Sequence, residues 1–297
     1  MATLRQWVGG ARPRTLPAAV APVAIGTGAA AADGGASAPA AVLALLVALA
    51  LQVGVNYAND YSDGVRGTDA ERVGPVRLVG QGLAAPEDVK LAAFACFAFA
   101  ALAGLALCAL ANTFWLLLAG AAAILAAWFY TGGRRPYGYL GLGEAFVFVF
   151  FGLVAVLGTQ FTQALRLSPA GWLGAVGCGA LSCAILMVNN IRDIPGDRVA
   201  GKRTLAVRLG ERRARLTYAG MIGAAFVATV LAAFWHVGAM AGLLSFALAV
   251  WPVTRTLQGA SGHDLVPVLG ATGRLTMAYG LLLGVGLALA PMPLLAG

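Results

Sequence analysis

Two polar segments interrupt an otherwise apolar sequence, and the first carries carboxylates at a spacing suited to metal binding. Residues 56–69 read NYANDYSDGVRGTD and follow a long apolar run. If that run is helical, Asn56, Asp60 and Asp63 lie at i, i+4 and i+7 and project from one face. Clustered carboxylates repel one another unless a hard cation lies between them, and Mg²⁺ prefers carboxylate and phosphate oxygens as ligands. The segment therefore predicts a site for Mg²⁺ and a phosphorylated ligand.

The second segment repeats this layout at the end of another apolar run. Residues 189–204 read NNIRDIPGDRVAGKRT, with Asn189 and Asp193 four residues apart and Asp197 following. Because Pro195 disfavours helix at the residue before it, we do not expect the two aspartates to share a regular helical face. We interpret the two segments as a weak internal repeat. Two acidic helix ends that face each other can hold a diphosphate through bridging metal ions, with neighbouring Arg and Lys side chains binding the remaining negative charge.

Two further basic segments have a functional and a structural interpretation. Residues 130–144, YTGGRRPYGYLGLGE, place Arg134 and Arg135 among glycines, where the backbone can approach a phosphate closely. Near the N-terminus, RPRTLP brings Arg14 to the start of an apolar run. Either segment is also compatible with a positive region that only fixes membrane topology, and residues 130–144 taken alone favour that structural interpretation.

Composition indicates a polytopic membrane protein. The chain of 297 residues is 60% hydrophobic and 11% charged, which is typical of helical membrane proteins. The net charge of +8 then reports orientation in the membrane, and we expect no nucleic-acid partner. The four cysteines lie in apolar runs without a CxxC pair, so we expect neither a disulfide framework nor a zinc site.

The apolar runs predict an all-α bundle of nine transmembrane helices that forms one domain over residues 1–297. We reject a cleavable signal peptide, because the first run is long enough to span and contains two prolines. With the N-terminus in the cytoplasm, every basic residue except Arg166 lies at the cytoplasmic face. The expected spans are residues 16–32, 39–60, 89–111, 113–130, 144–161, 172–190, 216–235, 237–257 and 275–295.

Two features of this topology bear on the site. The spans that deliver the two acidic segments run in the same direction, so the repeat is parallel and the bundle is expected to be pseudo-symmetric. The run FVFVFFG at residues 146–152 predicts a broad aromatic wall that either packs against lipid and protein or lines a channel for a long isoprenoid chain.

These motifs resemble those of the UbiA family of intramembrane prenyltransferases. The NDxxD at Asn59, Asp60 and Asp63 is similar to the family's first aspartate-rich motif, and Asp193 and Asp197 are similar to the second. Within the family, the segments RPRTLP, NDYSDGVRGTD and RRPYGYLGLGE most resemble those of the branch that prenylates 1,4-dihydroxy-2-naphthoate in menaquinone biosynthesis. One departure is Gly67, which stands where the commoner pattern has a third aspartate; Asp69 follows two residues later.

The resemblance implies an Mg²⁺-dependent enzyme in a bacterial plasma membrane, the cell inner membrane, with its active site toward the cytoplasm. The substrates it implies are a polyprenyl diphosphate and 1,4-dihydroxy-2-naphthoate, and the products are demethylmenaquinone, diphosphate and CO₂. Four residues are implied as catalytic metal ligands: Asp60, Asp63, Asp193 and Asp197. A fifth implied metal ligand is Asp69. The implied substrate-binding residues are Asn56, Asn59, Arg134, Arg135, Tyr137, Arg192, Lys202 and Arg14.

Other functions remain open at this level. Another acceptor, such as 4-hydroxybenzoate, homogentisate, a tetrapyrrole or a phosphoribosyl diphosphate, is compatible with the residues themselves. A secondary transporter also has many helices and intramembrane charges, but its charges are expected near the bilayer midplane, whereas the acidic segments here lie at one face. A soluble isoprenoid synthase uses paired aspartate motifs but lacks the apolar spans.

Overall fold

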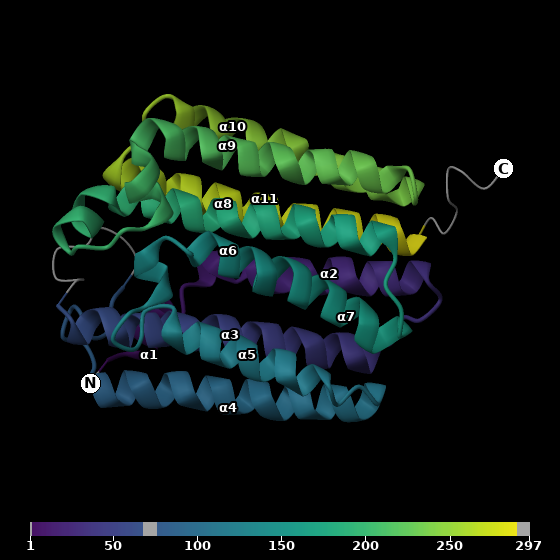
Figure 1. Cartoon of the computed structure of the whole chain (residues 1–297), viewed down its shortest axis with the longest axis horizontal. Coiled ribbons are helices and arrows are strands. Elements are labelled where there is room, and N and C mark those ends of the chain that lie inside the picture. Colours follow the sequence, from purple (N-terminus) through teal and green to yellow (C-terminus); the bar gives the residue numbers. More distant parts are fainter. Residues whose placement is uncertain (1, 68–75, 290–297) are drawn as a thin grey trace.

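The protein is a bundle of long helices. The computed structural model describes residues 2–67 and 76–289, and within these ranges it contains helices and turns but no strand. Figure 1 shows the longer helices lying side by side along the long axis of the molecule. The α-helices are α1 (Leu4–Gly10), α2 (Pro17–Ala32), α3 (Ala38–Val65), α4 (Pro86–Ala111), α5 (Leu116–Phe129), α6 (Gly143–Val147), α7 (Ala155–Ala164), α8 (Pro169–Val199), α9 (Leu205–Ala233), α10 (Ala247–Leu257) and α11 (Leu265–Leu289).

Short helices of other types complete the elements. A π-helix, η3 (Phe148–Val154), joins α6 to α7 within one apolar span, and a 3₁₀ helix, η4 (Val237–Phe246), precedes α10. Three further 3₁₀ segments lie in connections: η1 (Pro13–Thr15), η2 (Tyr137–Leu140) and η5 (Gly262–Asp264).

The helices have the length and composition of membrane spans, as expected for a polytopic protein. Within the described residues, seven helical segments qualify, and an eighth qualifies if the bent pair formed by residues 4–15 and 17–32 is counted as one span. The helix α5 is apolar but only 14 residues long. Nine spans and a cytoplasmic N-terminus therefore remain predictions.

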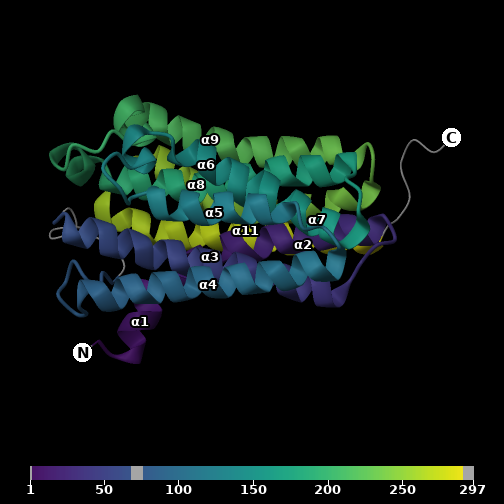
Figure 2. The same cartoon turned by 60° about the horizontal axis from the view of Figure 1, so that its bottom comes forward.

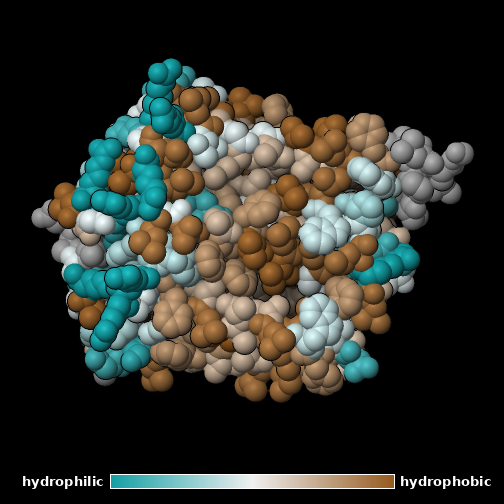
Figure 3. Space-filling model, viewed as in Figure 1, coloured by the Kyte–Doolittle hydropathy of each residue, from teal (hydrophilic) through white to brown (hydrophobic). Residues whose placement is uncertain are grey.

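Hydrophilic side chains gather at one end of the bundle. Figure 3 shows them mainly at the left end, while the middle of the same face is apolar. The C-terminal ends of α3 and α8 both lie at this end, as Figures 1 and 2 show from two directions. The helices that carry the two acidic segments therefore deliver them to the same end of the molecule.

The two helices that carry the acidic segments extend farther than the sequence predicted, and one of them corrects an expectation. The helix α3 continues to Val65 and thus includes Asp63. The helix α8 continues through Pro195 to Val199, so Asp193 and Asp197 lie one turn apart on a single helix. The expected break at Pro195 was wrong. Proline is tolerated inside membrane helices when neighbouring groups satisfy the freed backbone carbonyl.

Close packing of α2 against α11 joins the start of the chain to its end. A Cβ atom added to Gly28 would lie 2.1 Å from the carbonyl oxygen of Gly284, and one added to Gly280 would lie 2.4 Å from the Ala21 side chain. Small residues allow helix backbones to approach this closely. The helix α8 packs against both α9 and α11, so it runs through the centre of the bundle (Figure 1).

Candidate active site

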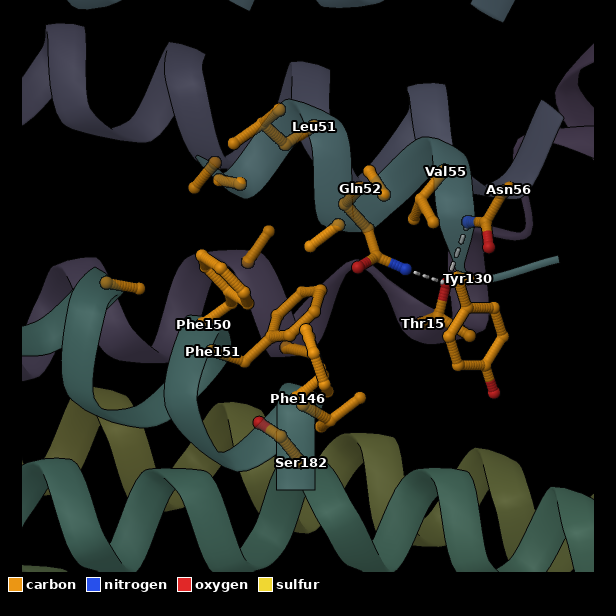
Figure 4. Close-up of a pocket in the computed structure, with 18 of the residues that line it drawn as sticks. Thr15, Leu51, Gln52, Val55, Asn56, Tyr130, Phe146, Phe150, Phe151 and Ser182 are labelled. Carbon is orange, nitrogen blue, oxygen red and sulfur yellow. Dashed lines mark hydrogen bonds between the residues drawn. The ribbon is translucent and has the colours of Figure 1, made fainter. Parts of the chain in front are cut away.

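A cavity of about 890 Å³ lies between the helices and is lined by both charged and apolar side chains; its polar end is the one where Asp63, Asp197 and Lys202 lie. Its apolar wall includes Phe146, Phe150 and Phe151, which come from α6 and η3 and face the cavity in Figure 4. The interpretation of the FVFVFFG run as a cavity wall is therefore favoured for these three phenylalanines. A π-helix occupies this wall, and such segments frequently occur at functional sites.

Asp63 is the acidic residue that α3 contributes to the cavity. Its carboxylate is buried and accepts hydrogen bonds from the Tyr139 hydroxyl and from Lys202 Nζ, which lies 3.1 Å from Oδ1. The Lys202 ammonium also lies 4.5 Å from the centroid of the Tyr139 ring, within the range of a cation–π interaction. Asp63, Tyr139 and Lys202 thus form one cluster at the polar end.

Asp197 is the acidic residue that α8 contributes. It is buried, lines the same cavity, and accepts a hydrogen bond from the Thr204 hydroxyl at 3.4 Å. The chain turns sharply after α8, with Gly201 at φ 70°, and the Lys202 amide donates to the Asp197 carbonyl at 2.8 Å. This turn positions Lys202 between the helices of the two aspartates, where its ammonium group could bind an anion in the cavity.

The other two aspartates have different surroundings. Asp60 is buried and accepts hydrogen bonds from the backbone amides of Leu78 at 2.7 Å and Val79 at 3.2 Å. Asp193 forms a bidentate ion pair with Arg192, with both oxygen–nitrogen distances at 2.8 Å. Neither aspartate lines the cavity. As the side chains lie, Asp60 anchors the loop after α3, and Asp193 holds the Arg192 guanidinium.

The predicted metal ligands are thus only partly assembled. Among residues 2–67 and 76–289, no three acidic, histidine or cysteine side chains lie close enough to hold a metal ion together. Asp69 lies outside the described residues. The donor chemistry at the cavity nevertheless fits Mg²⁺, because Asp63 and Asp197 bring carboxylate oxygens from two helices, and Asn59 and Asn189 add amide oxygens to the same lining.

The predicted substrate-binding residues divide into two groups. Those that line the cavity are Arg14, Asn56, Asn59, Tyr137, Arg192 and Lys202. The guanidinium nitrogen Nη1 of Arg192 is buried without a hydrogen-bond partner in the described part of the chain, so it can bind an anion in the cavity. Arg134 and Arg135 are exposed and do not line the cavity, which favours the topological interpretation of their loop.

Two of these side chains are already held by other groups of the protein, Tyr137 by a backbone carbonyl and Asn59 by a side-chain hydroxyl. Tyr137 donates from its hydroxyl to the Ala126 carbonyl at 2.8 Å. Burial raises the pKa of the Tyr137 phenol above its usual value, so this hydroxyl stays protonated and keeps donating at physiological pH. Asn59 accepts from the Thr131 hydroxyl at 2.8 Å, which fixes its amide beside Asp63.

Sequence reasoning missed several polar residues of the cavity. Thr15 and Gln52 meet there through a hydrogen bond of 2.8 Å, and Ser182 presents a hydroxyl from α8 (Figure 4). Arg12 and Arg77 also line the cavity. Gln52 carried a detectable signal, because it is a polar residue inside an apolar run four positions before Asn56. The contact with Thr15 joins residues far apart in the sequence and had no such signal.

Comparison with known proteins identifies relatives of this chain. The 1,4-dihydroxy-2-naphthoate octaprenyltransferase of Mycobacterium tuberculosis is 55% identical over 95% of this chain and 96% of its own length. The apo structure of a UbiA homolog from Aeropyrum pernix K1 superposes with a TM-score of 0.68 over 90% of this chain and 96% of that chain, at 16% identity.

A second solved structure, of a UbiA homolog from Archaeoglobus fulgidus bound to DMAPP and Mg²⁺, has a TM-score of 0.63 over 94% of this chain and 99% of that chain, at 16% identity. At this identity the two superpositions establish the fold. The profile of the UbiA prenyltransferase family matches residues 19–265. On the strength of this match and of the mycobacterial relative, the chain belongs to the UbiA prenyltransferase family.

Proposed function

We propose that this protein transfers a polyprenyl chain from polyprenyl diphosphate to 1,4-dihydroxy-2-naphthoate, with release of diphosphate and CO₂. The observation that carries the proposal is the cavity, in which Asp63, Asp197 and Lys202 meet at the polar end of an apolar space walled by aromatic rings. A polar end for a diphosphate and an apolar body for an isoprenoid chain match the two halves of the donor. The names of the curated relatives supply the naphthoate acceptor.

The residues at the polar end would hold the diphosphate together with Mg²⁺. Asp63 and Asp197 are the proposed metal ligands that line the cavity, and Asp60 and Asp193 would join them only after side-chain rearrangement. Asp69, which lies outside the described residues, is a further proposed ligand. The chemistry that Mg²⁺ supplies when bound is neutralisation of the negative charge on the departing diphosphate. Lys202 and Arg192 would bind the remaining phosphate oxygens through charge-assisted hydrogen bonds.

The chain's own residues prepare the reaction in two ways. Lys202 and Arg192 hold the leaving group, and the apolar wall excludes water from the allylic cation that forms as the carbon–oxygen bond to diphosphate breaks. The electron-rich ring carbon that bears the carboxylate forms the new bond to the first carbon of the prenyl chain. The bond between this ring carbon and the carboxylate then breaks to release CO₂, and the electron pair of that bond restores the aromatic ring. The direct product is demethylmenaquinol, the reduced form of demethylmenaquinone.

The proposed setting is a bacterial plasma membrane with the polar end of the cavity toward the cytoplasm. The seven to eight apolar spans and the concentration of charged side chains at one end support this orientation. A lipid bilayer would surround the bundle and supply the long-chain donor, and no nucleic acid takes part. The charged groups of Asp63, Asp197 and Lys202 lie at one end of the cavity, which argues against a transporter with a charged site at the bilayer midplane.

A product analysis tests the proposal. The purified protein is incubated with Mg²⁺, a polyprenyl diphosphate and, in separate reactions, 1,4-dihydroxy-2-naphthoate, 4-hydroxybenzoate and homogentisate. We expect mass spectrometry to detect a prenylated, decarboxylated naphthoquinol as the main product. Transfer to 4-hydroxybenzoate or homogentisate without a naphthoate product would refute the assignment of the acceptor.

A further inference from the structure

The cavity wall formed by α3 and η1 contains a hydrogen-bonded cluster of neutral side chains. Thr15, Gln52 and Asn56 are all buried and all line the cavity. Gln52 and Asn56 lie one helical turn apart on α3, and both reach the Thr15 hydroxyl, at 2.8 Å and 3.2 Å respectively. Figure 4 shows the three side chains together, with Phe146 and Phe151 on the other side of the cavity.

The hydrogen bonds of Thr15 determine which way the two amides face. The Thr15 hydroxyl donates its one proton to the Arg12 carbonyl at 2.9 Å, so it can only accept from its other neighbours. Asn56 must therefore present its amide nitrogen, which also donates to the Ala11 carbonyl at 2.9 Å. Gln52 must likewise present Nε2 to Thr15. The oxygen Oε1 of Gln52 is then directed away from Thr15.

The Gln52 oxygen is available to a ligand. Within the described residues, Gln52 donates to Thr15 and no protein group donates to its Oε1. In Figure 4 this oxygen points into the cavity, toward the side where Phe151 lies. A carbonyl oxygen accepts a hydrogen bond from a hydroxyl and repels a carboxylate. This position therefore suits a phenolic hydroxyl on an aromatic ring.

Resting on the proposed function, we infer that Gln52, held by Thr15, selects the acceptor by accepting a hydrogen bond from its 4-hydroxyl. In 1,4-dihydroxy-2-naphthoate, the 1-hydroxyl is next to the carboxylate and donates to it, so the proton of the 4-hydroxyl is the one left to donate. Gln52 precedes Asp63 by eleven residues on α3, which places it about 16 Å farther along the helix axis at 1.5 Å per residue. That separation leaves room for a diphosphate near Asp63 and an aromatic ring beside Gln52.

The inference predicts that the enzyme discriminates between acceptors with and without a hydroxyl proton at position 4. The test compares 1,4-dihydroxy-2-naphthoate with 1-hydroxy-4-methoxy-2-naphthoate, which keeps the electron-donating oxygen but has no hydroxyl proton at position 4. The smaller 1-hydroxy-2-naphthoate serves as a second analogue without the added methyl group. Each acid is assayed for kcat/KM at saturating polyprenyl diphosphate.

Replacing Gln52 by an apolar side chain of similar size tests the inference. Gln52→Met should lower kcat/KM for the dihydroxy acid about tenfold, equivalent to about 1.4 kcal/mol, while changing the values for both analogues less than twofold. The KM for the prenyl diphosphate should stay unchanged. Thr15→Val, which releases the amide from its anchor, should show the same selective loss, because a misplaced oxygen no longer meets the hydroxyl.

Controls separate this role from a structural one. Gln163→Met removes an amide that bonds Thr27 and the Ser37 backbone outside the cavity, and it should leave the ratio between the acids unchanged. If Gln52→Met does not fold, Gln52→Asn draws the amide back by one methylene and should show the same selective loss. An equal loss for all three acids, or no loss, would overturn the inference while leaving the proposed function intact. Absence of any prenylated naphthoate from the wild-type protein would instead overturn the proposed function.

Discussion

Replacement of Lys202 by methionine tests the polar end of the cavity most directly. The Lys202 ammonium is buried, lies 3.1 Å from Asp63 Oδ1 and stands above the Tyr139 ring. These contacts hold it where a diphosphate beside Asp63 would receive a charge-assisted hydrogen bond. Methionine keeps most of the volume of the side chain and removes the charge. The sequence offers a matched control, because Lys90 is the other lysine of the chain and is exposed on α4.

The expected magnitude follows from the type of contact. A hydrogen bond to a charged group contributes about 1.5–3 kcal/mol, so its loss from the transition state lowers kcat/KM roughly 10- to 150-fold. The variant also leaves the Asp63 carboxylate with one partner fewer, and breaking a buried ion pair destabilises a protein. We therefore expect Lys202→Met to unfold at a lower temperature than the wild-type protein, whereas Lys90→Met should match it.

The assay is initial-rate kinetics with varied polyprenyl diphosphate and fixed naphthoate, quantified by mass spectrometry of the quinol product. Thermal unfolding in the same detergent identifies variants that have lost their fold. If folded Lys202→Met and Lys90→Met have kcat/KM values within twofold of each other, Lys202 does not bind the leaving group, and the cluster with Asp63 is only structural.

Three further predictions concern the metal and the charged segments. EDTA should abolish turnover and added Mg²⁺ should restore it, and full activity in EDTA would contradict a metal site. For the same site, Asp63→Asn and Asp197→Asn should each lower kcat at least 100-fold, which corresponds to an increase of about 2.7 kcal/mol in the activation barrier. Asp60→Asn should lower the free energy of unfolding by about 1–2 kcal/mol, because an amide accepts only one of the two loop backbone hydrogen bonds well; unchanged urea or thermal unfolding would contradict this anchoring role. Arg134→Lys and Arg135→Lys should retain kcat/KM within about twofold, since lysine preserves a topological charge, and a tenfold loss would show that the loop reaches the diphosphate in the working enzyme.

The helical class, the approximate spans and the pairing of two acidic segments followed from local sequence patterns. Each of these depends on apolar run length or on residues within one turn, which a single sequence records directly. Pro195 shows the limit of such rules. The local preference against helix at the residue before proline was overridden by the packing of α8 inside the bundle.

Side-chain partners were beyond the reach of the sequence. Asp60 and Asp63 are three residues apart in the same motif, yet one binds the backbone of a loop and the other lines the cavity. The path of the chain after α3 decides which of the two aspartates binds the loop backbone and which one lines the cavity. Thr15 and Gln52 likewise meet only because η1 packs beside α3 in the folded bundle.

The close contact between α2 and α11 has a consequence for biogenesis. A Cβ on Gly273 of α11 would lie 2.7 Å from the Arg14 carbonyl in η1, so the last described helix directly abuts the segment that carries Thr15. A ribosome releases α2 before α11, and the N-terminal segment cannot take its final place until α11 has entered the membrane. The binding cavity is therefore completed only after α11 has been synthesised, and a truncation within α11 should remove activity even though every proposed ligand-binding residue is still present.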